Sequence, residues 1–153
     1  MRILIQRVSQ ATVRVGKETI AEIGHGLVAF VGIHEHDTDE GAQWMAEKVT
    51  QIRIFEDSDG KMNLSLNEMG GRVLVVSQFT LYAELRKGNR PNFMTAAGPE
   101  KAEAIYEEFL GYLRARLGEA RVTSGRFRAK MSVELINEGP VTILLEREHP
   151  SSA

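Results

Sequence analysis

The first part of the chain shows the period of two that is typical of β-strands. Residues 2–8 and 11–15 alternate between apolar and polar positions and are rich in β-branched side chains, which predicts strands. The pattern resumes in residues 18–23, so residues 16–17 are predicted to form a hairpin turn. Residues 25–33 form a nearly continuous apolar run, as expected for a strand that is buried on both faces.

Two later segments show helical spacing instead, with apolar side chains three and four positions apart. The first could be capped by Thr38 or Asp39, and the second begins at Gly98-Pro99, where proline suits the first turn. In the first helix the apolar positions are Ala42, Met45, Val49 and Ile52. In the second they are Ala102, Ile105, Phe109, Leu113 and Leu117.

The remaining apolar segments predict more strands. Residues 72–82 give the strongest strand pattern in the chain, and residues 86–93 form a basic loop that contains glycine and proline. Residues 130–136 and 141–146 are predicted to be two strands joined by residues 137–140.

The order of these elements predicts an α+β fold. We expect a mostly antiparallel sheet or partly closed β-barrel, with the two main helices packed outside it. A single domain should span residues 1–148, and residues 149–153 should form a frayed tail.

Composition narrows the functional classes. The net charge is −2, so contact with a nucleic acid would depend on local basic patches rather than on bulk charge. The chain has no cysteine, which excludes disulfides, thiolate nucleophiles and sulfur-based zinc sites. No apolar run approaches the ~18 residues that a membrane span needs, and the first residues lack the apolar region of a signal peptide. We therefore expect a cytoplasmic protein with no membrane contact.

The most unusual chemical feature is the segment Ser77, Gln78, Phe79 and Thr80, which places hydrogen-bonding side chains within an apolar strand. A buried polar group without a partner costs roughly 1–3 kcal/mol, so either these groups point into a polar cavity or the strand has a wet face. On a strand, Ser77 and Phe79 would face one way and Gln78 and Thr80 the other. Ser77 and Thr80 are candidate nucleophiles, but no histidine lies near them in the sequence to complete a Ser-His-Asp triad.

Other polar groups allow both a functional and an ordinary interpretation. Five basic residues could form a phosphate-facing patch, although the alternation in residues 124–131 also suits a wet strand face. These five are Arg86, Lys87, Arg90, Arg126 and Arg128. Residues 34–39 contain histidine and acidic side chains that could bind a metal, but a solvated loop is the simpler expectation. Residues 57–60 are a turn and not a calcium loop, because Phe55 and Leu66 would occupy ligand positions.

Beyond these patterns, the chain resembles the bacterial-type D-aminoacyl-tRNA deacylases along nearly its whole length. The segments that carry the resemblance are residues 1–13, 53–55, 60–63, 73–81, 90–93, 125–127 and 137–142. Residues 73–81 match the core motif of the family without departure. Residues 137–142 match its second motif, with Glu138 where aspartate is more common. Matches in order along a whole chain are more specific than any single short motif.

The resemblance implies a homodimer with active sites at the subunit interface, and hydrolysis of the ester that joins a D-amino acid, or glycine, to tRNA. It implies that Gly139-Pro140 is a cis dipeptide whose carbonyl oxygens reach the partner's site and exclude L side chains. From sequence alone, an ordinary turn there remains the default expectation, because only about 5–6% of X-Pro bonds are cis.

The resemblance also assigns the candidate site. Ser77, Gln78, Phe79 and Thr80 would form the catalytic segment, with oxyanion contacts from the backbone N–H groups of Phe79 and Thr80. Phe79, Phe127 and Met131 would line the pocket for the terminal adenosine. Either the substrate's ribose 2′-hydroxyl or Thr80 would assist catalysis, and no metal or cofactor is expected.

Two other functional classes remain open at this point. The chain could be a non-catalytic tRNA-binding or small-ligand-binding module, because the evidence for a nucleophile is weak. It could also be a general esterase that uses Ser77 or Thr80.

Overall fold

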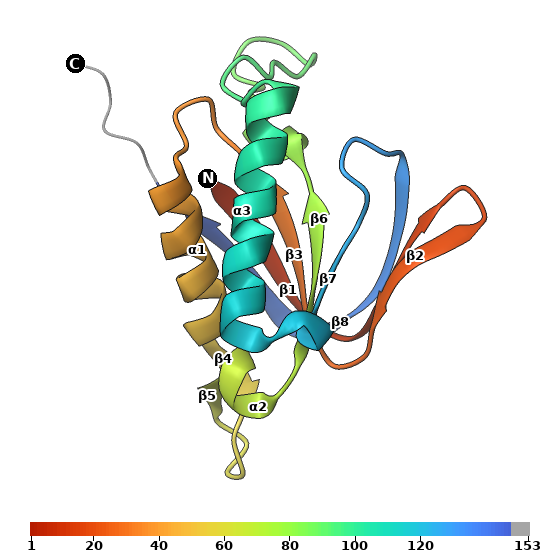
Figure 1. Cartoon of the computed structure of the whole chain (residues 1–153), viewed down its shortest axis with the longest axis vertical. Coiled ribbons are helices and arrows are strands. Elements are labelled where there is room, and N and C mark those ends of the chain that lie inside the picture. Colours follow the sequence, from red (N-terminus) through yellow and green to blue (C-terminus); the bar gives the residue numbers. More distant parts are fainter. Residues whose placement is uncertain (148–153) are drawn as a thin grey trace.

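The computed structural model describes residues 1–147, so the predicted tail at 149–153 lies outside the described residues (Figure 1). The elements are β1 (Arg2–Val15), β2 (Glu18–Ile23), β3 (Gly26–Gly32), α1 (Asp39–Gln51), β4 (Arg53–Glu56), β5 (Met62–Ser65), α2 (Leu66–Met69), β6 (Arg72–Ser77), the 3-10 helix η1 (Phe79–Tyr82), α3 (Pro99–Leu117), the 3-10 helix η2 (Glu119–Arg121), β7 (Val122–Ser124) and β8 (Met131–Glu146).

The main sheet is built around β1. Its strands follow the order β2-β1-β3-β6-β7, and β8 also pairs with β1. Strand β1 pairs antiparallel with β2, β3 and β8, whereas β3–β6 and β6–β7 are parallel. Parallel neighbours need crossover connections, and the two crossovers contain α1 and α3. The predicted α+β fold with a partly closed sheet is confirmed. The sheet is mixed, because β3–β6 and β6–β7 are parallel pairs beside the antiparallel strands.

Both predicted helices are confirmed, and Figure 1 shows them side by side on one face of the sheet. Helix α1 is capped by Thr38, whose hydroxyl oxygen accepts a hydrogen bond of 3.2 Å from the Gly41 N–H. Helix α3 begins at Pro99, and its predicted apolar positions are all buried. The apolar stripes of the two helices therefore point at the sheet, as their spacing requires.

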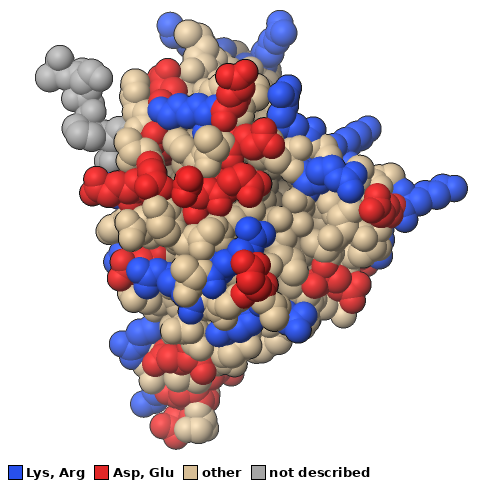
Figure 2. Space-filling model, viewed as in Figure 1, with Lys and Arg blue, Asp and Glu red and all other residues tan. Residues whose placement is uncertain are grey.

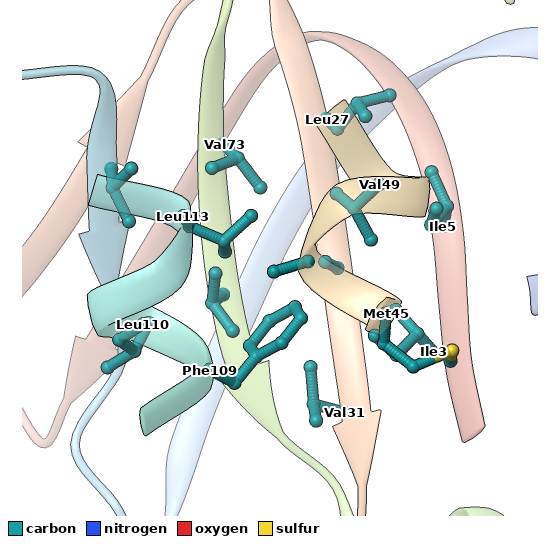
Figure 3. Close-up of a cluster of buried hydrophobic side chains, with 14 of the residues drawn as sticks. Ile3, Ile5, Leu27, Val31, Met45, Val49, Val73, Phe109, Leu110 and Leu113 are labelled. Atoms are coloured by element: carbon teal, nitrogen blue, oxygen red, sulfur yellow. The ribbon is translucent and has the colours of Figure 1, made fainter. Parts of the chain in front are cut away.

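The main core lies between these helices and the sheet (Figure 3). Alternate residues of the strands contribute one layer, and α1 and α3 contribute the other. The labelled residues, all buried, are Ile3, Ile5, Leu27, Val31, Met45, Val49, Val73, Phe109, Leu110 and Leu113. A second, smaller buried cluster on the other face of the sheet includes Val28 and Leu74. Strands β3 and β6 are thus buried on both faces, as the apolar run at residues 25–33 predicts.

The strand predicted at residues 72–82 is wrong in its second half. Strand β6 ends at Ser77, which pairs with Val31 close to the end of β3, so little of β3 remains for the chain to pair with. The Gln78 N–H still donates to the Val31 carbonyl at 2.7 Å. The chain then turns into η1, and the alternating directions predicted for residues 77–80 do not apply.

Other boundaries also differ from the predictions. Residues 2–8 and 11–15 form one strand, and residues 131–146 form one strand rather than two joined by a turn. Both halves of β8 pair with β1, and residues 138–141 bulge out opposite Arg7. Strand β7 ends at Ser124, so residues 125–130 are a loop and not the expected wet strand. The β4–β5 hairpin and α2 were not predicted, because each is only four residues long.

Candidate active site

A cavity of about 590 Å³ opens at the end of β6, between η1, the segment before α3, and the loop between β7 and β8. Ser77, Gln78 and Phe79 line one side of it, and Phe127 and Met131 line another. These residues come from two segments that are about 50 positions apart in the sequence. With Arg128, six of the predicted site residues line the cavity. The composition of residues 77–80 had left open whether that segment meets a cavity or forms a wet strand face.

The hydroxyl of Thr80 has a contact that bears on its predicted chemical role. The side-chain amide of Gln78 donates a hydrogen bond to the Thr80 oxygen. An amide cannot remove a proton from a hydroxyl, so this contact does not activate Thr80 as a nucleophile. Thr80 is exposed and does not line the cavity, whereas Ser77 is half-buried and does.

The backbone of η1 provides a different kind of polar group. In a 3-10 helix, each N–H bonds to the carbonyl three residues earlier, so the first N–H groups have no partner inside the helix. Here the Leu81 N–H donates to Gln78 at 3.2 Å, and the Ala83 N–H donates to Thr80 at 3.1 Å. The N–H groups of Phe79 and Thr80 precede this series. They have no partner inside the helix, and Phe79 lines the cavity. Unpaired backbone N–H groups are the kind of donor that can stabilise an oxyanion.

Aromatic side chains border the same space. Phe79 is 57% exposed, and its ring lies 5.0 Å from the ring of Phe93, centre to centre. Phe127 is half-buried and packs 5.6 Å from the Tyr106 ring. Sequence reasoning did not assign a role to Phe93, although it lies in one of the matching segments. Its position beside a basic loop was the only available signal.

The five predicted basic residues are exposed, but only Arg128 lines the cavity. Arg126 lies on the same loop and forms an ion pair of 3.6 Å with Glu18. The other three lie on a loop whose base is closed by two backbone hydrogen bonds between Glu84 and Asn92, of 2.8 and 3.0 Å. Figure 2 shows Lys and Arg side chains projecting along the upper and right edges of this face. Of the five, Arg128 alone is placed to meet a ligand inside the cavity.

Gly139-Pro140 does not line this cavity. The peptide bond between the two residues is cis, as the family resemblance implies, and both residues are exposed on the bulge of β8. The side-chain amide of Asn137 holds the bulge by donating to the carbonyls of Arg7 and Val141, each at 3.0 Å.

The polar segment 34–39 is mostly exposed, as expected for a solvated loop, but Asp37 is an exception. Asp37 is 1% exposed and lies 2.6 Å from the terminal amine of Met1, whose pKa is lowered by burial. Within residues 1–147, no group of three His, Cys, Asp or Glu side chains is placed to hold a metal ion. In the same range, no helix is both long enough and apolar enough to cross a membrane.

Comparisons with known proteins identify the family of the chain. The family model described as D-Tyr-tRNA(Tyr) deacylase matches residues 4–146. The D-aminoacyl-tRNA deacylase of Shouchella clausii is 56% identical over 97% of this chain and 100% of its own length, and that of Thermotoga petrophila is 53% identical over 95% and 97%.

Two solved structures are also similar. One, described as a c-Myc DNA unwinding element binding protein, is 40% identical with a TM-score of 0.93, over 97% of this chain and 100% of that one. The other, described as a probable eukaryotic D-amino acid tRNA deacylase, has a TM-score of 0.82 over 94% of this chain and 97% of that one; at 20% identity it supports the fold alone. On the family match and the two bacterial relatives, the chain belongs to the D-Tyr-tRNA(Tyr) deacylase family.

Proposed function

We propose that the protein hydrolyses the ester bond of D-aminoacyl-tRNA, releasing the free D-amino acid and tRNA. We further propose that it accepts glycyl-tRNA and spares L-aminoacyl-tRNA, and that it acts in the cytoplasm, where charged tRNA is used. The observation that carries the proposal is an aromatic-lined cavity bordered by Phe79, at the start of a 3-10 helix whose first N–H groups, those of Phe79 and Thr80, have no partner inside the helix. The names of relatives that are 56% and 53% identical support the substrate class.

In the proposed reaction, water attacks the ester carbonyl, and the resulting oxyanion is held by the N–H groups of Phe79 and Thr80. Fixed backbone donors are effective because they need no reorganisation as charge develops. The contact between Gln78 and Thr80 argues against a threonine nucleophile. We therefore assign the assisting hydroxyl to the ribose 2′ position of the substrate, and no protein side chain forms a covalent intermediate.

The apolar walls of the cavity suit the terminal adenosine. Phe79, Phe127 and Met131 line it, and Phe93 adds a further ring next to Phe79. Stacking of a base on an aromatic side chain contributes roughly 1–3 kcal/mol and does not depend on the amino acid carried by the tRNA. An enzyme that accepts many D side chains must bind groups that all of its substrates share, because it cannot bind one particular side chain tightly.

We assign chiral rejection to Gly139 and Pro140 of a second copy of the chain. On one chain these residues are exposed and lie outside the cavity. They could therefore act only on the cavity of another copy of the chain, next to which they would lie in a dimer. Carbonyl oxygens placed near the α-carbon would clash with an L side chain while leaving a D side chain free. Glycine has no side chain to reject, which explains why glycyl-tRNA would be accepted.

The face of the sheet opposite α1 and α3 is only partly covered by the smaller buried cluster, and its open part offers a surface for that second copy. Leu4 of β1 pairs with Phe30 of β3 on one side and with Leu144 of β8 on the other, and all three face away from α1 and α3. Leu144 is 48% exposed, and Phe79 on the nearby η1 is 57% exposed. An apolar row of this kind next to the cavity fits a homodimer whose two sites lie near the contact.

The first experiment measures the deacylation of D-Tyr-tRNA, L-Tyr-tRNA and glycyl-tRNA by the chelator-treated protein. We expect D-tyrosine and glycine to be released well above the spontaneous rate, while L-Tyr-tRNA stays charged. Binding of D-Tyr-tRNA without release would contradict the proposal and favour a non-catalytic tRNA-binding module. Turnover of simple activated esters that is lost in Ser77→Ala or Thr80→Ala would favour a general esterase.

A further inference from the structure

Arg2, at the start of β1, reaches across the sheet to η1 and makes three contacts with one guanidinium group. Its Nη1 donates a hydrogen bond of 2.9 Å to the Leu81 carbonyl. Its Cζ lies 4.7 Å above the centre of the Tyr82 ring. Its Nε lies 2.7 Å from Oε1 of Glu146, which stands directly opposite Arg2 on β8. The guanidinium therefore joins the end of η1 to two strands of the sheet.

Gly32, at the end of β3, pairs directly with Arg2 and also lies against η1. A Cβ atom at Gly32 would lie 3.0 Å from the Gln78 carbonyl oxygen and 3.1 Å from Cβ of Leu81. Only the absence of a side chain allows this approach. Helix η1 thus contacts two neighbouring positions of the sheet, the guanidinium of Arg2 and the backbone of Gly32, and Tyr82 is only 6% exposed.

We propose that Arg2 is a positioning residue for the hydrolysis, acting through η1 on the N–H groups of Phe79 and Thr80. This inference rests on the proposed function. A 3-10 helix of four residues has weak hydrogen-bond geometry of its own, so its position must be imposed by its surroundings. Phe79 and Thr80 are both exposed, with the Phe93 ring beside Phe79 and the Gln78 amide bonded to the Thr80 hydroxyl. Arg2 supplies that constraint at the end of the segment away from the two donors.

The shape of the arginine side chain matters as much as its charge. A guanidinium is planar, offers several donors in fixed directions and stacks on an aromatic ring, so it can meet Leu81, Tyr82 and Glu146 at once. A lysine keeps the charge, but its ammonium is a single point that cannot hold all three contacts. The Arg2→Lys variant should therefore recover only part of the function of Arg2, and Arg2→Met should recover none.

The test compares Arg2→Met and Arg2→Lys with Arg14→Met. Arg14 is a matched control, because it is another arginine of β1, is 42% exposed compared with 38% for Arg2, and pairs with Glu134 of β8 at 2.8 Å. It has no contact with η1 among those described for the chain. We expect Arg2→Met to lower the kcat for D-Tyr-tRNA by about 100-fold with little change in KM, as for displaced catalytic groups. The kcat of Arg2→Lys should lie between those of Arg2→Met and the wild type. Arg14→Met should retain the wild-type kcat.

Hydrogen exchange of the backbone amides of Leu81 and Ala83, whose hydrogen bonds hold η1 together, gives a second readout that does not need activity. Faster exchange there in Arg2→Met, but not in Arg14→Met, is expected. An unchanged kcat or unchanged exchange in Arg2→Met would overturn the inference, and so would equal losses in Arg2→Met and Arg14→Met. If Arg2→Met does not fold, the kcat and amide exchange of Arg2→Lys and Glu146→Gln test the inference in its place. A wild-type protein that leaves D-Tyr-tRNA intact would refute the proposed function, while the exchange data would still test the positioning by Arg2.

Discussion

The two motif segments of this chain differ in how they relate to the cavity. The segment at residues 77–82 lines the cavity, rests on Gly32 and is held by Arg2. The segment at residues 137–140 forms a bulge on β8 whose tip, Gly139-Pro140, is exposed and lies outside that cavity. One chain therefore contains the proposed hydrolytic part of the site but does not place the proposed chiral part next to it.

The difference suggests that two copies of the chain contribute different parts of each active site. The oxyanion donors need a fixed position relative to the ester, so they are built into the packing of the sheet. The rejection of L side chains needs only a rigid obstacle, which a second subunit can supply. Changes to η1 should consequently alter the rate, whereas changes to the bulge should alter the selectivity.

The largest effect on rate is expected from Gly32→Ala. The new Cβ would approach the Gln78 carbonyl and Leu81 within about 3 Å, so η1 must shift, and we expect kcat to fall by about 100-fold or more. Gly24→Ala is the matched control, because a Cβ there meets nothing within 4 Å. Single-turnover deacylation of D-Tyr-tRNA measures both variants. A wild-type rate in Gly32→Ala would show that the position of η1 does not govern the chemistry.

A smaller effect is expected from Phe127→Leu, which keeps an apolar group beside Tyr106 but removes the aromatic ring from the cavity. Loss of stacking should weaken tRNA binding by roughly 1–3 kcal/mol and leave the preference for D over L unchanged. Equilibrium binding of uncharged tRNA measures this loss, and Met62→Leu, at an exposed site on β5, is the control. Unchanged affinity would remove Phe127 from the adenosine pocket.

The smallest effect is expected from the exposed basic loop. Replacing Arg86, Lys87 and Arg90 with glutamine should make the binding constant less dependent on salt, because fewer phosphates are then neutralised by the protein. The slope of log K against log salt concentration should fall by about one for each phosphate that is no longer neutralised. Selectivity between D and L substrates should not change. The control is Lys61→Gln, on the turn between β4 and β5. A salt dependence equal to that of the wild type would mean that this loop does not bind phosphates.

The sequence was most informative where a pattern extends over a whole element. The spacing of Ala42, Met45 and Val49 predicted α1, and the run at residues 25–33 predicted a strand buried on both faces. Local pattern was least informative at residues 78–82, where strand-like apolar residues form a 3-10 helix. The reason is tertiary, because β3 has almost ended at Val31, where it pairs with Ser77.

The candidate site shows the same limit. The composition of residues 77–80 allowed either a polar cavity or a wet strand face, and residues 77, 78 and 79 line a cavity. The functional groups that we assign, however, are backbone N–H groups, and their orientation cannot be deduced from side-chain identity. The contacts of Arg2 with Leu81 and Tyr82 join segments about 80 positions apart, so no local pattern could indicate them.

The most direct test of the central claim uses Asn137→Ala, which removes both side-chain hydrogen bonds that hold the bulge. Each such bond contributes about 0.5–1.5 kcal/mol, so the bulge should loosen without unfolding the protein. We expect this variant to hydrolyse L-Tyr-tRNA while keeping its rate on D-Tyr-tRNA. Mixed dimers of Asn137→Ala and Gly32→Ala subunits can be isolated with two different affinity tags.

In such a mixed dimer, the only active cavity belongs to the Asn137→Ala subunit, and the only intact bulge belongs to the Gly32→Ala subunit. If each cavity is completed by the bulge of the partner, the mixed dimer should spare L-Tyr-tRNA as the wild type does. If the mixed dimer hydrolyses L-Tyr-tRNA as the Asn137→Ala homodimer does, or if the wild type is a monomer, the claim of a site shared between subunits is contradicted.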